Sequence, residues 1–224
     1  MNDLALSDLK TEVFFKELST IAKNEIIKTE YPWQIIPKIK EIIFSLIPSL
    51  PNSFNEIKEG VWVENGAQIA KSAEIIAPCI ICKSQIRTGA YLRGRVIVGR
   101  GCVVGNSTEI KNAILFDGAK CPHYNYVGDS VLGYKAHMGA GAIISNQKSD
   151  KSRVFISLSS SKIDTGLDKM GAILSDEVEI GAGSVLNPGS VICARSNVYP
   201  LVSLRGAIGK GLIYKDKNTI VEKY

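Results

Sequence analysis

The sequence lacks a hydrophobic run long enough to cross a bilayer. Its best apolar stretch, residues 42–47, is far shorter than the roughly 20 residues that a transmembrane helix needs. The first residues include no basic segment followed by an apolar one, which is the pattern of a targeting signal. We therefore expect a soluble, cytoplasmic protein with no membrane partner.

Histidine is scarce, and the number of cysteines is odd. The chain contains two histidines, His123 and His137, and five cysteines, of which Cys79 and Cys82 have CxxC spacing. A zinc site of this type needs a second pair of ligands, and the sequence offers neither another CxxC nor a histidine nearby. Reduced, mostly structural thiols and no metal are expected.

Neither sign of charge dominates. The chain has 27 Lys and Arg against 22 Asp and Glu, and the basic residues are spread along its length. Such a diffuse surplus does not indicate a nucleic-acid partner, because binding to phosphate backbones needs clustered basic side chains. A mild preference for anions is all that it suggests.

What the sequence does contain is a six-residue repeat from Val63 to about Ser203. Aliphatic residues stay in phase through two long series: Leu92, Val98, Val104 and Ile110, then Leu174, Ile180, Leu186, Ile192 and Val198. A spacing of six indicates that each short strand turns a corner and delivers the next aliphatic residue inward, so three strands close a coil. The repeat predicts a mainly β fold, a parallel β-helix shaped as a triangular prism with coils of about 18 residues. The phase slips by one residue near Ile86 and Val127.

Three further segments flank or interrupt the predicted β-helix, which covers 53–204. Residues 1–52 show helical spacing, and we expect them to cap the N-terminal end of the solenoid, where a sheet edge would otherwise be exposed. The repeat is lost at about 147–169, which predicts an inserted loop or hairpin. It is either a tolerated surface insertion or a lid or subunit contact. Residues 205–224 are expected to form a solvated tail.

Register arithmetic brings two cations together. Arg93 and Lys111 are separated by the length of one predicted coil, so they should lie on adjacent coils, about 4.8 Å from strand to strand. Like charges so close repel each other, and a bound phosphate would relieve the repulsion; the alternative is that both side chains are simply solvated. His123 lies beside a break in the repeat and is either a general base or an ordinary surface residue. A γ-type carbonic anhydrase, also built on such prisms, would need a third histidine.

Three runs carry a family resemblance: Gly105 to Lys111 (GNSTEIK), Pro122 to Ser130 (PHYNYVGDS) and Met138 to Gly141 (MGAG). They resemble the acetyltransferase half of the bacterial bifunctional N-acetylglucosamine-1-phosphate uridyltransferase/glucosamine-1-phosphate acetyltransferase. They also resemble the C-terminal half of archaeal sugar-1-phosphate nucleotidylyltransferases. This resemblance to hexapeptide-repeat acyltransferases covers most of the predicted β-helix. It implies a left-handed β-helix, a homotrimer, and metal-independent transfer of acetyl from acetyl-CoA to an amino-sugar phosphate such as glucosamine-1-phosphate, a step of UDP-N-acetylglucosamine biosynthesis.

The resemblance also implies roles for individual residues. His123 matches the family's catalytic base. Substrate-binding positions fall on Arg93, Lys111, Tyr126, His137 and Lys151, and positions that contact acetyl-CoA fall on Ala140, Asn146, Ala182 and Pro200.

The chain departs from the family pattern in places. The family has Asn at the position of His137 and Tyr at that of Gln147, which leaves the acceptor sugar open. The chain has no Gly-rich nucleotide-binding segment near its start, so no nucleotidyltransferase activity is expected. Two alternatives stay open. One is a non-catalytic scaffold or regulatory protein that works through its helical segment, and the other is an acyltransferase with a different sugar acceptor.

Overall fold

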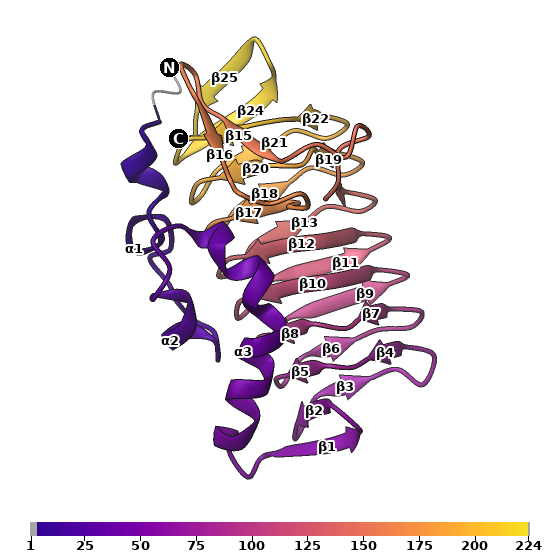
Figure 1. Ribbon diagram of the computed structural model, residues 1–224. Helices are drawn as coiled ribbons and strands as arrows, with labels where there is room; N and C mark the ends of the chain where they lie inside the picture. The colour runs from indigo at the N-terminus through magenta and orange to yellow at the C-terminus, as the bar shows by residue number, and fades with distance from the viewer. Residues whose placement is uncertain (1–3, 224) are drawn as a thin grey trace.

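The aliphatic residues of the repeat point inward and stack into one continuous core. The computed structural model describes residues 4–223 and shows a mostly β protein with a solenoid of about nine turns, so the predicted parallel β-helix is confirmed (Figure 1). Leu92, Ile110, Val127 and Ile144 are register partners on four successive coils, and all four are fully buried. Burial of such a stripe is the main stabilising contribution to a solenoid.

Parallel strands form three faces, which we number in chain order. The first face contains β2 (Val61–Glu64), β5 (Cys79–Ile81), β8 (Val96–Val98), the C-terminal halves of β10 (Glu109–Leu115) and β12 (Tyr126–Leu132), β17 (Ala172–Leu174), β20 (Ser190–Ile192) and β23 (Ala207–Ile208). The second contains β3 (Gln68–Ile69), β6 (Gln85–Ile86), β9 (Val103–Asn106), β11 (Lys120–His123), β13 (His137–Met138), β18 (Glu179–Ile180), β21 (Asn197–Val198) and β24 (Leu212–Asp216). The third contains β4 (Glu74–Ile76), β7 (Tyr91–Arg93), the N-terminal halves of β10 and β12, β14 (Ile143–Ile144), β19 (Val185–Leu186) and β22 (Ser203–Leu204).

The coils differ in length around the predicted value of about 18 residues. Tyr91 pairs with Glu109 at the predicted spacing, whereas Cys79 pairs with Val96, and Val96 with Ala113, at a spacing shorter by a single position. A coil that turns a corner with fewer residues still keeps its strands in register. The slips of phase in the sequence are therefore shorter corners and not breaks in the solenoid.

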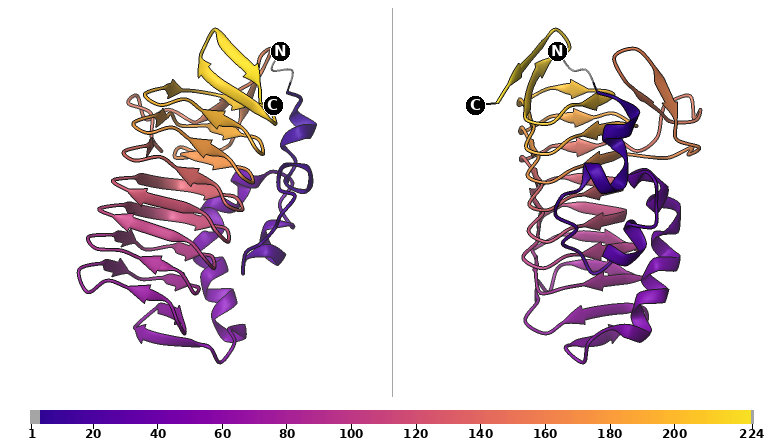
Figure 2. Two further views of the ribbon diagram at one scale, coloured as in Figure 1. Left: turned by 180° about the vertical axis from the view of Figure 1, so that it is seen from behind. Right: turned by 90° about the vertical axis from the view of Figure 1, so that its left-hand side faces the viewer.

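The N-terminal segment is helical, but it does not cap the end of the solenoid. It comprises η1 (Leu6–Leu9), α1 (Thr11–Phe14), α2 (Lys23–Ile26), η2 (Pro32–Lys38), α3 (Ile39–Leu46) and η3 (Ile47–Ser49). Figure 2 shows this segment lying lengthwise along the stacked strands. We call it the helical strap; it covers the outer side of the first face.

The first face needs this cover because it is apolar on both sides. Alternate residues of a strand point to opposite sides of a sheet, yet all three residues of β5, β8 and β17 are buried. The outward residues pack with the strap in a second hydrophobic cluster that includes Ile97, Ile114 and Phe116. A face buried on both sides reads as a continuous apolar run, as in other parallel sheets.

Hydrogen bonds from the strap to two corner aspartates hold it in place. Asp176 accepts the backbone N–H groups of Lys16 at 2.8 Å and Glu17 at 2.9 Å. Asp117 accepts the hydroxyl of Ser19 at 2.8 Å. Burial raises the pKa of Asp176, although the hydrogen bonds that it accepts act in the opposite direction.

The lost repeat corresponds to an inserted hairpin of β15 (Phe155–Ser157) and β16 (Lys162–Asp164). Val154 and Ile156 are fully buried in the same outer cluster as the strap. The hairpin also touches the coils after it, since a Cβ at Gly189 would lie 2.5 Å from the Phe155 carbonyl oxygen. Its apolar side is therefore used by its own chain, and the hairpin extends the cover of the first face.

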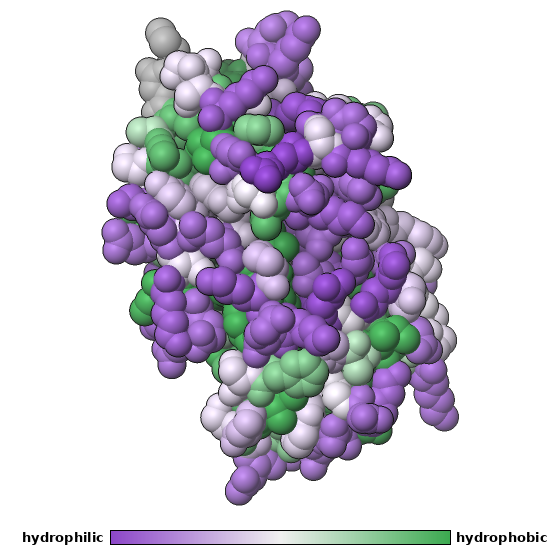
Figure 3. Space-filling model, viewed as in Figure 1, coloured by the Kyte–Doolittle hydropathy of each residue, from purple (hydrophilic) through white to green (hydrophobic). Residues whose placement is uncertain are grey.

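Antiparallel strands close both ends of the solenoid. β1 (Phe54–Lys58) pairs with β2 at the N-terminal end, and β25 (Thr219–Glu222) pairs with β24 at the C-terminal end. The predicted solvated tail is thus wrong, because β23 and β24 continue the parallel ladders beyond residue 204. In the view of Figure 3 the surface is mostly hydrophilic, with apolar patches near the N-terminal helices. No helix in residues 4–223 is long and apolar enough to span a membrane.

The CxxC pair is split between two environments. Cys79 belongs to the inner core and Cys82 to the outer cluster beneath the strap, so the two thiols lie on opposite sides of the sheet. Burial raises the pKa of Cys79, Cys82, Cys121 and Cys193 to about 12 in each case, and it raises that of Cys102 as well.

We expect none of the five thiols to react rapidly with Ellman's reagent in the native protein, because reaction requires an accessible thiolate. All five should react after denaturation in guanidinium chloride. The absorbance of the released thiolate measures the reaction of the native and of the denatured protein. A fast phase from the native protein would contradict the buried positions.

We expect Phe116→Ala to lower the free energy of unfolding by about 3–5 kcal/mol. The Phe116 side chain is fully buried between the first face and the strap, with its ring centroid 4.8 Å from that of Phe15. Phe155→Ala, at a side chain 41% exposed on the inserted hairpin, is the matched control and should change stability by about 0.5 kcal/mol. Equal effects in denaturant titrations would show that the strap is not held by this contact.

Candidate active site

Four of the predicted site residues gather where the third face turns into the first. Arg93 ends β7, Lys111 lies in β10 and Asn146 follows β14, while Tyr126, at the start of β12, reaches this corner with its hydroxyl. The register of β7 and β10, with Leu92 opposite Ile110, places Lys111 one coil from Arg93, as their spacing predicted. We call this region, with its neighbours Glu109 and Asp129, the anion corner.

Both cations of the anion corner have acidic partners within the chain. Arg93 Nη1 donates to Glu109 Oε1 at 2.7 Å, and Lys111 Nζ lies 3.9 Å from Asp129 Oδ2. The hydrogen bond to Glu109 raises the pKa of the Arg93 guanidinium. The expected repulsion between Arg93 and Lys111 is therefore already offset, so their spacing alone does not require a bound anion.

Tyr126 and Asn146 meet over Gly128. The Tyr126 hydroxyl donates to Asn146 Oδ1 at 3.4 Å, and Asn146 Nδ2 donates to Asp129 Oδ2. A Cβ at Gly128 would lie 2.7 Å from Tyr126 Oη and 3.0 Å from Asn146 Cγ, so only glycine leaves room for this contact. Desolvation raises the pKa of Tyr126, which keeps the phenol protonated as a hydrogen-bond donor.

His123 lies at a different edge, where the second face turns into the third. It ends β11, is exposed, and pairs in register with Asn106. Ala140, Ala182 and Pro200 follow at the same edge on successive coils, since the Gly141 N–H donates to the His123 carbonyl at 2.9 Å and the Gly183 N–H to the Ala140 carbonyl at 2.8 Å. We call this edge the histidine edge.

The histidine edge offers unused backbone donors. Within residues 4–223, the N–H groups of Ala140 and Ala182 donate no hydrogen bond, whereas those of Gly139 and Gly141 donate to Ile180 and His123. Ala140 and Ala182 are exposed, and the nearby side chains of Tyr124 and Leu201 are 65% and 85% exposed. Open donors beside exposed apolar groups suit a ligand that carries both carbonyl groups and apolar surface.

The histidine edge and the anion corner lie at the two opposite edges of the third face. The strand that begins at Tyr126 leaves the histidine edge and reaches the anion corner at Gly128 and Asp129. Within residues 4–223, the imidazole of His123 has neither a hydrogen-bond partner nor an ion pair. A single chain thus presents the base and the anion anchors without joining them.

Two predicted substrate-binding residues fall outside both regions. His137 lies in β13 on the second face, and its Nδ1 is 2.8 Å from Glu179 Oε2. Lys151 is exposed in the loop that precedes the inserted hairpin. Within residues 4–223, neither side chain forms a hydrogen bond or ion pair with a residue of the anion corner.

Sequence reasoning missed Glu109, Asn112 and Asp129. Glu109 had a readable signal, because it precedes Lys111 by two residues and so points to the same side of the strand. Asp129 stood inside the run that carried the family resemblance. Asn112, whose side chain donates to Asp129 Oδ1 at 2.7 Å, carried no signal, because its contact depends on a left-handed corner with φ +49°.

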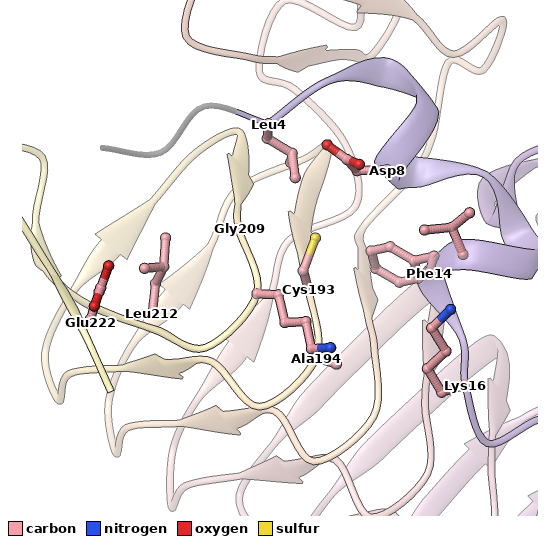
Figure 4. Close-up of a pocket in the computed structure, with 11 residues that line it drawn as sticks. Leu4, Asp8, Phe14, Lys16, Cys193, Ala194, Gly209, Leu212 and Glu222 are labelled. Carbon is pink, nitrogen blue, oxygen red and sulfur yellow. The ribbon is translucent and has the colours of Figure 1, made fainter. Parts of the chain in front are cut away.

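A pocket of about 390 Å³ lies away from these regions, between the strap and the last coils (Figure 4). Leu4, Phe14 and Leu212 supply apolar walls, and Asp8, Lys16 and Glu222 supply charges of both signs. None of the predicted site residues lines it.

Comparisons with known proteins agree on the region that carries the site. The sequence model of the family described as "GMPPB C-terminal domain" matches residues 75–200, which include every predicted site residue. A bifunctional sugar-1-phosphate nucleotidylyltransferase/acetyltransferase of Sulfurisphaera tokodaii is 33% identical over 82% of this chain and 47% of that protein. The bifunctional protein GlmU of Methanococcus maripaludis is 30% identical over 86% of this chain and 48% of that protein.

These relatives match through their C-terminal part, and the chain spans about half the length of the curated relatives it matches. Among solved structures, a hexapeptide transferase family protein from Anaplasma phagocytophilum aligns with 74% of this chain and 81% of that chain. Its sequence identity is 19% and its TM-score 0.42.

Proposed function

Because this chain belongs to the family of the GMPPB C-terminal domain, we propose that it transfers an acetyl group from acetyl-CoA to the amine of an amino-sugar phosphate similar to glucosamine-1-phosphate. One observation carries the proposal. The exposed imidazole of His123 lies one coil from the unused N–H of Ala140, at the same edge of the solenoid. A base and an oxyanion donor side by side are what acyl transfer to an amine requires.

His123 acts as the general base. It takes a proton from the sugar amine as the nitrogen attacks the thioester carbonyl carbon, and a C–N bond forms. The tetrahedral intermediate then collapses, the C–S bond breaks, and the thiolate of CoA leaves and receives the proton from the His123 imidazolium. The Ala140 N–H donates to the oxyanion, a contact that contributes about 3 kcal/mol to lowering the barrier in comparable sites.

Acetyl-CoA lies along the histidine edge, where Ala140, Ala182 and Pro200 follow one another on successive coils. The Ala182 N–H is a second open donor for a carbonyl of the pantetheine arm. Asn146, which lies across the third face at the anion corner, would complete the predicted contacts of the cofactor from a neighbouring chain. No step in this mechanism uses a metal ion.

Arg93 and Lys111 anchor the phosphate of the acceptor. The Arg93 side chain is 43% exposed, and its pair with Glu109 is a surface ion pair, which contributes little because water and salt screen it. A dianionic phosphate, which accepts two parallel hydrogen bonds from a guanidinium, can therefore displace Glu109. The hydroxyl of Tyr126 contacts the sugar.

A homotrimer would complete the site. His123 and the anion corner lie at opposite edges of the third face, and a neighbouring chain can bring its anion corner next to His123. The strap covers the first face, which leaves the second and third faces available for contact between copies. The same contact would place His137 or Lys151 of a neighbouring chain near the acceptor.

A scaffold or regulatory role is the second candidate function. The ion pairs of Arg93 with Glu109 and of Lys111 with Asp129, and the contact of His137 with Glu179, favour it, because each occupies a group that substrate would need. The third candidate function is acyl transfer to a sugar acceptor other than glucosamine-1-phosphate.

We expect wild-type protein to release CoA thiol from acetyl-CoA only when an acceptor is present, and His123→Ala to lower kcat about a hundredfold or more. Glucosamine-1-phosphate, galactosamine-1-phosphate and unphosphorylated glucosamine are compared with a blank. Lys120→Ala, on the same strand as His123, is the control and should keep its activity. Acceptor-dependent release that is equal in wild type and His123→Ala would rule out the base, and no release with any acceptor would favour the scaffold.

We expect light scattering after size-exclusion chromatography to give three times the chain mass of 24.3 kDa. His123→Ala and Arg93→Ala should each be inactive alone but regain part of the activity when unfolded and refolded together, because mixed trimers contain sites with both intact residues. A fully active monomer, or no recovery in trimers that are shown to be mixed, would contradict a shared site.

A further inference from the structure

Asp129 holds a central position in the anion corner. Its side chain is 7% exposed, Oδ1 accepts a hydrogen bond from Asn112 Nδ2 at 2.7 Å, and Oδ2 accepts one from Asn146 Nδ2. Oδ2 also lies 3.9 Å from Lys111 Nζ. One buried carboxylate thus meets a cation and two amides.

The Asp129 carboxylate determines the orientation of the side-chain amides of Asn112 and Asn146. An ionised carboxylate only accepts hydrogen bonds, so the NH₂ groups of Asn112 and Asn146 must both face Asp129. The amide oxygen of Asn146 consequently faces the Tyr126 hydroxyl, which donates to it at 3.4 Å. The orientation of three groups in the anion corner therefore depends on the charge of Asp129.

The same network reaches the covers of the first face. Asn112 Nδ2 lies 3.4 Å from the carbonyl oxygen of Ile36, in η2 of the strap. The Asp129 carbonyl accepts the Gly171 N–H at 2.8 Å, and the Asn146 carbonyl accepts the Met170 N–H at 3.0 Å, where the insertion rejoins the solenoid. Asp129 is therefore held from several sides and has little freedom to move.

We propose that Asp129 is a positioning residue that holds Lys111 and Asn146 in their working orientations and limits the affinity of the anion corner for phosphate. The proposal rests on the proposed function for the identity of the ligand. Without the carboxylate, Lys111 would lose its nearest counter-charge and bind an anion more tightly. Asn146 would lose its fixed orientation at the same time, so tighter binding would come with slower turnover.

Asp129→Asn tests this inference with little change to the backbone. Asp129 has φ +47°, in the left-handed region that Asn also adopts readily. The new NH₂ group faces an amide NH₂ of Asn112 or Asn146 and cannot accept from it. In isothermal titration with inorganic phosphate we expect the Kd to fall about threefold. With glucosamine-1-phosphate as acceptor, kcat should fall about tenfold, because Asn146 is no longer held in place.

Two further variants separate positioning from general damage. Asp176→Asn removes another buried corner carboxylate, one that fastens the strap and lies outside the anion corner, so its phosphate affinity and kcat should match wild type. If Asp129 acts through Asn146, the double variant Asp129→Asn with Asn146→Ala should lower kcat no further than Asn146→Ala alone.

The phosphate titration decides the inference separately from the activity. An unchanged or larger Kd in Asp129→Asn, the same change in Asp176→Asn, or no binding of phosphate by the wild type overturns the role of Asp129. A wild type that binds phosphate but acetylates no acceptor removes the proposed function. A smaller Kd in Asp129→Asn then still supports the charge-limiting role of Asp129.

Discussion

The stacking of aliphatic side chains inside the prism is the contact on which the other features depend. Each coil places an apolar residue on each face against that of the next coil, and the parallel backbones hydrogen-bond in the same register. Because alternate residues of a strand point outward, this register also aligns the outward-facing residues in rows. Arg93 and Lys111 form one such row, and His123 with Ala140 forms another. The apolar core thus places the polar groups of the surface.

Much of the solenoid could be predicted because its contacts are nearly local. Residues one coil apart touch, so the pattern of one coil predicts the next. The place of the strap could not be predicted in this way. A run such as Val96 to Val98 shows that both sides of a strand are buried, but not which distant segment covers it. The contact between His137 and Glu179 could not be predicted either, because the insertion separates the two residues in sequence. The contact of Asp129 with Asn112 depends on left-handed corner geometry that the repeat does not encode, whereas Glu109 could have been found from its spacing to Lys111.

The strap links stability to the candidate site. Its apolar side fills the outer cluster, while its η2 turn lies against β12 and contacts the anion corner through Ile36 and Asn112. It covers the first face and leaves the histidine edge open. A segment far from the site in sequence therefore selects which surfaces of the prism remain for ligands and for other copies of the chain.

The antiparallel strands at the two ends have a consequence for the assembly of many molecules. A stack of parallel coils presents unpaired backbone groups at each end and would act as a template for end-to-end growth into fibres. Here β1 and β25 occupy parts of these ends, and they bring Lys58 and Glu222 with them. The number of coils is therefore limited where β1 and β25 add antiparallel strands, since the packing of the coils themselves sets no limit.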